Sequence, residues 1–597
     1  MIRVSHRGSG SRGTCLLLES VVVGLSLLTL TAWFAGWPPG LPAWLPAGVA
    51  LVAVAARLWL GRLTLSRPAP ETLLCLAVAL AFRLPVLQHP WGWVNKDGFY
   101  GAMVALHVLQ GIRPAPAFLE GVNYQGTLKA HLAALLSLLT GSQDLAWVMA
   151  ASSAVLSLVF ILATMTLARR LAGRGAALVA GLYLALGPKF LTTITMDCQG
   201  HYVEILALGG LALAWLARLL DEGVTGSRAR IPYFGVGLLL GAALWQQPVA
   251  ACYVAAALLA LGLRRTTWTD PWALLVPLGL VVGLWPVLLW NALNDWGSRE
   301  ILARSTTTWP EVLGGLPRHA WRTLSISFPV LAGLSPGHPL RKLPGMTAAA
   351  ACLPILLLVA HLGLRGRGLW GSLARWRPQA ALLPPLLMAA SLGIFWAVPA
   401  DLVHLRPRYV LPVAAATAVH LGVVGAWAWS RWRLLSCLGL GLLLSLNVSG
   451  MLPRLWAGRE IAERYRRLVH TLDQKGIRTG YADFSIAAPV TMFTAERIVI
   501  SPRLGPTPNY ESKVHARMVD ERGADAYVLD PSDDPERFAA LLRSLGVQFR
   551  LDEEPVTIFY GFSRRVRFEE VAGFRDFGDP PVARRRGLRR RAQEAAE

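Results

Sequence analysis

The stretch His89-Pro-Trp-Gly-Trp-Val-Asn-Lys-Asp-Gly-Phe-Tyr100 interrupts a strongly apolar sequence. It follows an apolar segment that ends near Leu87, and polar residues continue to about His131. The carboxylate of Asp97 therefore comes just after a segment that is long enough to cross a membrane. Such a group is either a solvated loop residue or the centre of a site, and the rest of the sequence has to discriminate between the two.

The composition predicts an all-α polytopic membrane protein. Of the 597 residues, 54% are apolar and only 16% are charged, whereas a soluble protein carries about 25% charged residues. Apolar runs that can cross a hydrocarbon core of roughly 30 Å recur along the chain and indicate about thirteen transmembrane helices. The predicted spans are 15–36, 42–60, 71–88, 144–168, 175–190, 201–220, 232–247, 249–264, 271–291, 347–364, 380–398, 409–429 and 433–451.

The net charge of +22 comes mainly from arginines in short loops between apolar segments. Basic residues of this kind mark cytoplasmic loops, so the pattern argues against nucleic-acid binding. They alternate with loops that lack them, which predicts a cytoplasmic N-terminus and an extracytoplasmic C-terminal region. The basic loops contain Arg3/Arg7/Arg12, Arg62/Arg67, Arg169/Arg170/Arg174, Arg228/Arg230, Arg264/Arg265, Arg365/Arg367/Arg375/Arg377 and Arg431/Arg433. The six cysteines include no Cys-x-x-Cys pair and support neither a zinc site nor a disulfide framework.

The chain divides by composition into a transmembrane domain at 1–451, an extracytoplasmic α/β domain at 452–580 and a basic, disordered tail at 581–597. In the second of these, strand-like runs at 497–501, 526–529 and 556–560 alternate with helical runs at 458–475 and 534–545. The same topology places four connections of the transmembrane domain on the outer side. These are 89–143, 189–200, 292–346 and 399–408.

Asp97 is the first candidate for catalysis. Its neighbours Trp93, Phe99 and Tyr100 would partly exclude water, which raises the pKa of a carboxylate and makes it a better base, whereas Lys96 would counteract this. The alternative is a solvated loop aspartate.

Two further clusters lie on the predicted outer side. Tyr124, Gln125 and Lys129 offer the hydrogen bonds that a sugar or phosphate needs, unless they only line an interfacial amphipathic helix. His201 and Glu204 are three residues apart, so both lie on one face of a helix, and Asp197 precedes them. An ionisable group within an apolar span usually marks function, and the alternative is a structural His–Glu pair.

Arg406 and Arg408 lie at the outer end of a predicted span, against the positive-inside trend. Arginine is the residue best shaped for bidentate phosphate binding. We therefore expect Arg406, Arg408 and the adjacent Tyr409 to bind a phosphate group, with lipid headgroup contact as the alternative.

Together these motifs resemble the integral-membrane glycosyltransferases of the GT-C type. The chain is similar to bacterial members of the dolichyl-phosphate-mannose protein mannosyltransferase family (glycosyltransferase family 39), which includes the aminoarabinose transferase of lipid A. The resemblance covers essentially the whole chain. It rests on Asp97 followed by Gly121–Gly126, on Gly200-His-Tyr-Val-Glu204, on Arg408-Tyr-Val-Leu-Pro412, and on Tyr481-Ala-Asp-Phe-Ser485 followed by Glu496-Arg-Ile-Val-Ile500.

The resemblance implies an enzyme of the bacterial inner membrane. Asp97 would be the catalytic residue, the donor a sugar on a polyprenyl phosphate, and the acceptor a lipid, glycan or protein. The family often has a second acidic residue beside this aspartate, where this chain has Lys96 and Gly98, so a divalent cation is left open as a cofactor. The alternative functions are a ligase or polymerase of envelope glycans, a lipid-sugar flippase and a non-catalytic envelope assembly factor.

Overall fold

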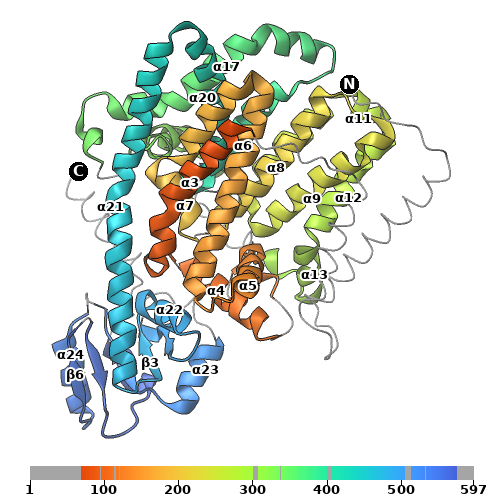
Figure 1. Cartoon of the computed structure of the whole chain (residues 1–597). Coiled ribbons are helices and arrows are strands. Elements are labelled where there is room, and N and C mark those ends of the chain that lie inside the picture. The colour runs from red at the N-terminus through yellow and green to blue at the C-terminus, as the bar shows by residue number, and fades with distance from the viewer. Residues whose placement is uncertain are drawn as a thin grey trace.

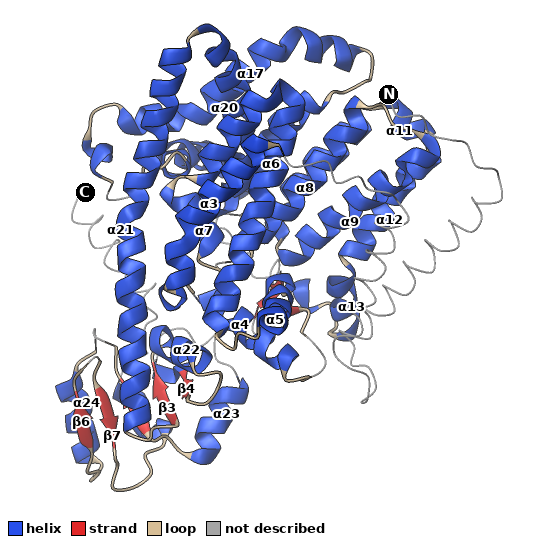
Figure 2. Ribbon diagram, in the orientation of Figure 1, coloured by secondary structure: helices blue, strands red, loops and turns tan. Residues whose placement is uncertain are grey.

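Helices make up most of the molecule, and strands occur in two places (Figures 1 and 2). The structure, a computed structural model, describes residues 69–94, 96–112, 116–119, 122–198, 200–299, 307–335, 338–399, 406–504, 513–530, 533–554 and 556–574. The predicted spans at 15–36 and 42–60 and the tail at 581–597 lie outside these residues.

Seven of the described helices are long and apolar enough to cross a membrane, or eight if the bent pair Pro271–Gly283 and Trp285–Leu293 is one span. The predicted total of thirteen is not reached in this part of the chain. The predicted spans 232–247 and 249–264 form helices too short to be counted as crossings. The α-helices of this region are α3 (Pro70–Gln88), α4 (Lys96–Leu109), α5 (Leu128–Thr140), α6 (Leu145–Ala185), α7 (Lys189–Met196), α8 (Tyr202–Asp221), α9 (Arg230–Gln246), α10 (Ala251–Gly262), α11 (Arg265–Thr269), α12 (Leu275–Gly283), α13 (Trp285–Leu293), α15 (Trp309–Arg322), α16 (Phe328–Leu331), α17 (Met346–Ala374), α18 (Leu383–Ala397), α20 (Leu411–Arg431) and α21 (Arg433–Gln474).

Helix α6 consists of two halves that run antiparallel. The backbone leaves the helical region at Ala172 and Gly173, between the predicted spans 144–168 and 175–190. Near one end of α3, Glu71 lies 3.4 Å from Arg169 and 3.8 Å from Arg174. Further along α3, Arg83 donates to Ser157 in the first half and to the carbonyl of Ala185 in the second. Only a hairpin with its turn near residue 172 satisfies all of these contacts.

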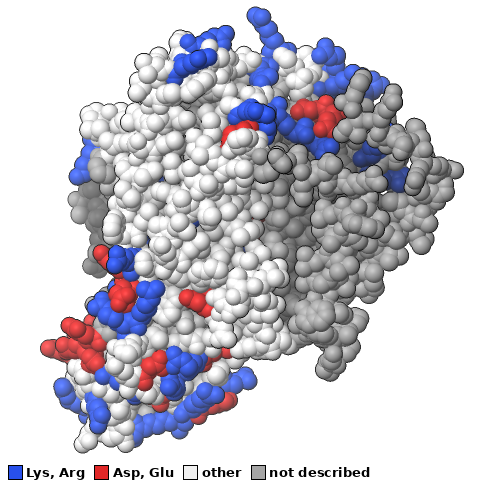
Figure 3. Space-filling view, viewed as in Figure 1, with Lys and Arg blue, Asp and Glu red and all other residues white. Residues whose placement is uncertain are grey.

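Four of the loops predicted to be cytoplasmic meet at one end of the bundle in the described structure. Arg170 pairs with Glu222 at 3.2 Å, Arg365 donates to the carbonyl of Leu171, and the amide of Arg265 donates to the carbonyl of Trp376. Lys and Arg side chains crowd this end in Figure 3, and mixed charges cover the opposite end. A broad uncharged band separates the two ends over α3, α6 and α21, as expected of a surface that contacts lipid.

The opposite end carries a five-stranded mixed sheet with strand order β4-β3-β5-β7-β6. Strand β3 (Thr479–Ala482) pairs in parallel with β4 (Val499–Ser501) and β5 (Ala526–Val528). Strand β7 (Ile558–Tyr560) is antiparallel to β5 and to β6 (Arg550–Asp552). Helices α22 (Phe484–Phe493), α23 (Lys513–Arg522) and α24 (Pro535–Ser544) lie in the same region. The runs expected as strands correspond to β4, β5 and β7, whereas β3 and β6 were missed.

Helix α21 joins the bundle to this C-terminal region without a break. It runs for 42 residues from Arg433 to Gln474 and combines the predicted span 433–451 with the helix expected separately at 458–475. In Figure 1 it passes along the side of the bundle and ends among the strands. The expectation of two separate helices is therefore wrong. The C-terminal region follows directly on a helix that continues out of the predicted span.

The C-terminal region also packs directly on α4, the helix that carries Asp97. The rings of Trp91 and Phe493 stack with centroids 4.2 Å apart, and Tyr100 stacks on Phe484 at 6.0 Å. Near the other end of α4, His107 lies 3.2 Å from Glu496, which also contacts His515 at 2.7 Å. These contacts fix α4 along its length.

Candidate functional site

Asp97 and Lys96 form the first turn of α4, and their side chains lie outside the described part of the structure. The next residues are described: Phe99 and Tyr100 are both buried. They share an apolar cluster with Cys198, which precedes α8, and with Met149 of α6. The start of α4 therefore adjoins the segment that contains the second predicted cluster.

Lys129, His201 and Glu204 form a buried ionic cluster. Lys129 Nζ lies 3.3 Å from Glu204 Oε1 and donates to the carbonyl of Cys198 at 3.2 Å. His201 Nδ1 lies 2.8 Å from the same Glu204 oxygen. The expectation that both residues lie on one face of a helix is wrong, because α8 begins at Tyr202 and His201 precedes it in a left-handed backbone conformation. All three side chains are at most 1% exposed. Removing one member of a buried ion pair is strongly destabilising, so we expect substitutions within this cluster to lower the stability of the protein.

The backbone before α8 adopts an unusual conformation. Cys198, Gly200 and His201 all have positive φ angles, of 53°, 60° and 57°. A Cβ on Gly200 would approach the ring of Tyr202 to 2.4 Å, so glycine is required there. Left-handed non-glycine residues are uncommon and concentrate at functional sites. Gly200 is part of the motif quoted from the sequence, but the left-handed turn around it was not predicted.

The thiol of Cys198 is buried next to this turn and contacts the hydroxyl of Ser153 at 3.2 Å. Burial raises the pKa of the Cys198 thiol to about 11. A thiol with this pKa is protonated at neutral pH, so Cys198 is part of the packing and no nucleophile.

His201 presents one free ring nitrogen. Nε2 is buried and has no hydrogen-bond partner within the described ranges. With the proton on Nδ1, which faces the Glu204 carboxylate, Nε2 carries the acceptor lone pair. It could accept a hydrogen bond from a ligand hydroxyl.

Arg408 and Tyr409 lie beside the start of α8. Arg408 Nη2 donates to Tyr409 Oη at 3.1 Å, and its guanidinium lies 5.0 Å from the centre of the Tyr409 ring. The Tyr409 ring packs edge-on against Tyr202, the residue after His201, at 6.4 Å. The structure therefore brings together two motifs that are far apart in sequence, at Tyr202 and Tyr409. Arg406 is exposed, in contrast to the half-buried Arg408.

Tyr124 and Gln125 lie on a short hairpin of β1 (Phe118–Leu119) and β2 (Val122–Gly126) rather than on a helix. Gln125 is buried and Tyr124 half-buried. The hairpin is tied to α9, because Trp245 Nε1 donates to the carbonyl of Ala117 at 2.8 Å. The hairpin belongs to the same connection as α5, which carries Lys129, and the structure describes no direct bond from Tyr124 or Gln125 to the ionic cluster.

Asp197 has a partner that the sequence reasoning missed. Arg454 of α21 lies 3.5 Å from Asp197 Oδ1 and donates to the carbonyl of Gly92 at 3.1 Å. Its guanidinium also stacks 4.1 Å from the centre of the Trp93 ring. The available signal was the one applied to Arg406 and Arg408: an arginine at the outer end of a predicted span, where topology does not require it.

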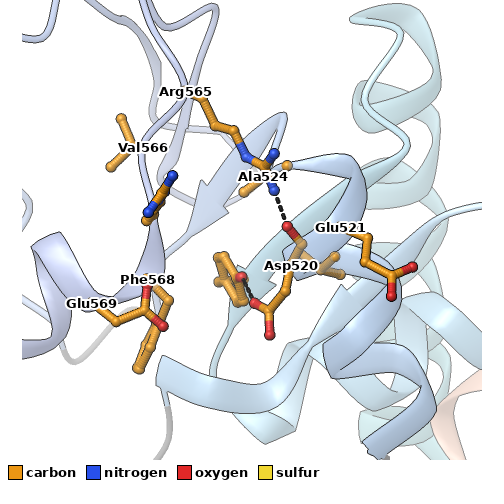
Figure 4. A pocket seen from close by; sticks show the side chains of 11 residues that line it. Asp520, Glu521, Ala524, Arg565, Val566, Phe568 and Glu569 are labelled. Atoms are coloured by element: carbon orange, nitrogen blue, oxygen red, sulfur yellow. Dashed lines mark hydrogen bonds between the residues drawn. The ribbon is translucent and has the colours of Figure 1, made fainter.

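Among the described residues, no three His, Cys, Asp or Glu side chains are grouped so that they could hold a metal ion. A cavity of about 370 Å³ lies in the C-terminal region (Figure 4), and none of the predicted site residues lines it. Asp520, Glu521, Arg565 and Phe568 are among its lining residues.

The comparisons with known proteins agree with the predicted fold. ArnT from Cupriavidus metallidurans bound to undecaprenyl phosphate is 16% identical and superposes with a TM-score of 0.53, over 82% of this chain and 97% of that one. The chain has the GT-C type fold. The Archaeoglobus fulgidus oligosaccharyltransferase in the apo form gives a weaker likeness, with a TM-score of 0.44 and 12% identity over 79% of this chain and 71% of that one. No protein-family model and no curated protein matches the sequence.

Proposed function

We propose that this protein is a membrane glycosyltransferase that moves a sugar from a polyprenyl-phosphate donor to an acceptor hydroxyl at the outer face of the bacterial inner membrane. The observation that carries the proposal is the GT-C fold, shared over nearly the full length of an ArnT structure that holds undecaprenyl phosphate. Asp97, Lys129, His201, Glu204, Arg408 and Tyr409 belong to segments that adjoin one another in this fold, which supports a common site for them.

Asp97 acts as the base in the proposed mechanism. Its carboxylate takes the proton from the acceptor hydroxyl, the acceptor oxygen forms a bond to the anomeric carbon, and the bond from that carbon to the phosphate oxygen breaks. The electron pair of the broken bond leaves with the lipid phosphate. A phosphate is a weakly basic leaving group, so a single carboxylate suffices, unlike the carboxyl pair of a glycosidase.

Arg408 would bind the donor phosphate and stabilise the negative charge that it gains as the bond breaks. Tyr409 supports this by accepting a hydrogen bond from one guanidinium nitrogen, which restricts the rotation of the arginine. Arg406 is exposed and would attract the anionic donor from the lipid surface.

The Lys129–Glu204–His201 cluster would contribute a hydrogen-bond acceptor for the sugar. The ammonium of Lys129 is already occupied by Glu204 and the Cys198 carbonyl, which favours an indirect role over a phosphate contact. Nε2 of His201 would accept a hydrogen bond from a sugar hydroxyl, and Glu204 would hold the ring in the required tautomer.

The test is to incubate the purified protein in lipid nanodiscs with radiolabelled polyprenyl-phosphate sugars and membrane extract as the acceptor source. The proposal predicts release of free lipid phosphate together with transfer of the label to a new product. A flippase in sealed vesicles would change the leaflet of the donor and leave it intact. Movement of intact donor with no lipid phosphate released would contradict the proposal.

A further inference from the structure

Arg454 lies where α21 meets two segments that lead into the candidate site. Its Nη2 group donates to the carbonyl of Gly92 at 3.1 Å and lies 3.5 Å from Asp197 Oδ1. The face of the guanidinium lies over Trp93, 4.1 Å from the ring centre. The side chain is only 19% exposed, so these interactions are weakly screened by solvent.

Each contacted segment is followed closely by a candidate site residue. Trp93 precedes Asp97 by four residues, and Asp197 precedes His201 by four residues. The two segments belong to different connections, 89–143 and 189–200, and Arg454 contacts both of them with one side chain. We propose that Arg454 is a positioning residue that fixes the start of α4 relative to the start of α8. This proposal rests on the function proposed above.

The packing around Arg454 holds the 89–94 segment closely against α21. A Cβ on Gly92 would lie 1.8 Å from the carbonyl oxygen of Gly458, one turn along α21 from Arg454. A Cβ on Gly458 would lie 2.4 Å from Trp93 Nε1. Both positions therefore require glycine, and Trp93 itself is 1% exposed. The 89–94 segment is held against α21 by backbone contact, and the guanidinium extends that contact to Asp197.

The chemistry of the junction suits arginine in particular. One group has to stack on an indole ring, donate to a carbonyl and face a carboxylate at the same time. A planar guanidinium with five N–H donors can do all three, whereas the ammonium of lysine is a compact charge that cannot stack in the same way. Lysine at this position should retain the attraction to Asp197 and lose the stacking on Trp93.

The test compares Arg454→Met and Arg454→Lys with Arg467→Met, an exposed arginine of the same helix. Hydrogen exchange in nanodiscs needs no substrate and measures the two segments directly. Arg454→Met should speed hydrogen exchange in peptides covering 90–98 and 197–202, and the exchange rate of β3 should not change. Arg454→Lys should have a smaller effect, and Arg467→Met none. Asp197→Asn should loosen 197–202 and leave 90–94 as in the wild type.

The kinetic arm uses the transferase assay on the same variants. A base displaced by about 1 Å can lose about 100-fold in rate, so Arg454→Met should lower kcat by about 10- to 100-fold with a much smaller change in the donor KM, and Arg454→Lys should restore part of kcat. If Arg454→Met left hydrogen exchange unchanged in either segment, the proposal that Arg454 holds both segments in place would be wrong. Faster exchange in both segments with wild-type kcat would overturn the positioning role. Absence of transfer by the wild-type protein would count against the proposed function alone, since the exchange result stands without it.

Discussion

Trp91 and Phe493 stack face to face, with ring centroids 4.2 Å apart and an angle of 10° between the ring planes. Trp91 belongs to the segment that leads into Asp97, and Phe493 ends α22 of the C-terminal region. The Phe493 ring also packs edge-on against Phe99 and Tyr465. Phe493 therefore joins three aromatic partners at one of the points where the C-terminal region contacts the candidate catalytic helix, beside the Tyr100–Phe484 stack and the His107–Glu496 contact.

Replacing Phe493 by alanine should loosen this connection. An aromatic pair contributes about 0.5–1.5 kcal/mol beyond its buried area, and the three ring contacts of Phe493 are lost together. We expect faster proteolysis between α21 and β3 and faster hydrogen exchange at the start of α4. Phe493→Tyr keeps the ring and serves as the control. Equal protease resistance of the alanine and tyrosine variants would contradict the role of the stack.

The buried pair of Lys129 and Glu204 should dominate the stability of the site. Lys129→Met removes the ammonium partner of the Glu204 carboxylate, which is 0% exposed and keeps only the contact with His201, and should lower the stability by about 3–5 kcal/mol. The double variant Lys129→Met/Glu204→Gln removes both charges and should regain part of this loss. The exposed pair Arg170–Glu222 is the matched control, where Arg170→Met should cost about 0–1 kcal/mol. Thermal unfolding in detergent at one scan rate ranks the stability of these variants. An equal loss of stability in Lys129→Met and Arg170→Met would contradict the prediction.

The contact between Glu496 and the two histidines should make the C-terminal region sensitive to acid. Burial alone would raise the pKa of Glu496, but hydrogen bonds with His107 and His515 hold this pKa at about 2. The folded-state pKa is thus below the value of about 4.3 for an unfolded glutamate, so the stabilisation is complete above about pH 4.3 and is lost as the pH falls toward 2. Glu496→Gln should flatten the pH dependence of thermal stability in that window. If Glu496→Gln kept the pH dependence of thermal stability seen in the wild type, the acid sensitivity would not come from Glu496.

Arg408 should matter mainly for donor binding. Loss of a charge-assisted hydrogen bond costs roughly 1.5–3 kcal/mol, which corresponds to about a 10- to 150-fold rise in the dissociation constant of a polyprenyl-phosphate donor. Arg408→Gln should show this rise. Tyr409→Phe removes only the hydroxyl that accepts from Arg408, so its effect should be smaller. Donor affinity measured with fluorescent polyprenyl phosphate separates the two variants, and wild-type affinity of Arg408→Gln would exclude the phosphate role.

The sequence predicted the helical membrane fold because hydropathy and loop arginines are local signals. The same signals identified the hairpin within α6 and the gathering of the basic loops at one end. They did not reveal that α21 continues past its apolar part, since the drop in hydropathy at Arg454 resembles the end of a span. The burial of β3 and its pairing with β4 and β5 depend on contacts between distant segments.

The candidate site was predictable where its residues are close in sequence, as for His201 and Glu204. The pairing of Lys129 with Glu204, the contact of Tyr409 with Tyr202 and the junction at Arg454 connect separate helices and could not be read from spacing. The role of Asp97 remains a prediction, supported by the position of α4 beside the ionic cluster.

The central claim is that Asp97 is the base of a sugar transfer from a polyprenyl-phosphate donor. The most direct measurement is the rate of lipid phosphate release from a labelled donor by Asp97→Asn, compared with the wild type in the same nanodiscs. The asparagine cannot accept the proton, so the rate should fall by at least about 100-fold, while donor affinity and thermal stability stay near wild type. Near-normal release by a folded Asp97→Asn variant would contradict the account.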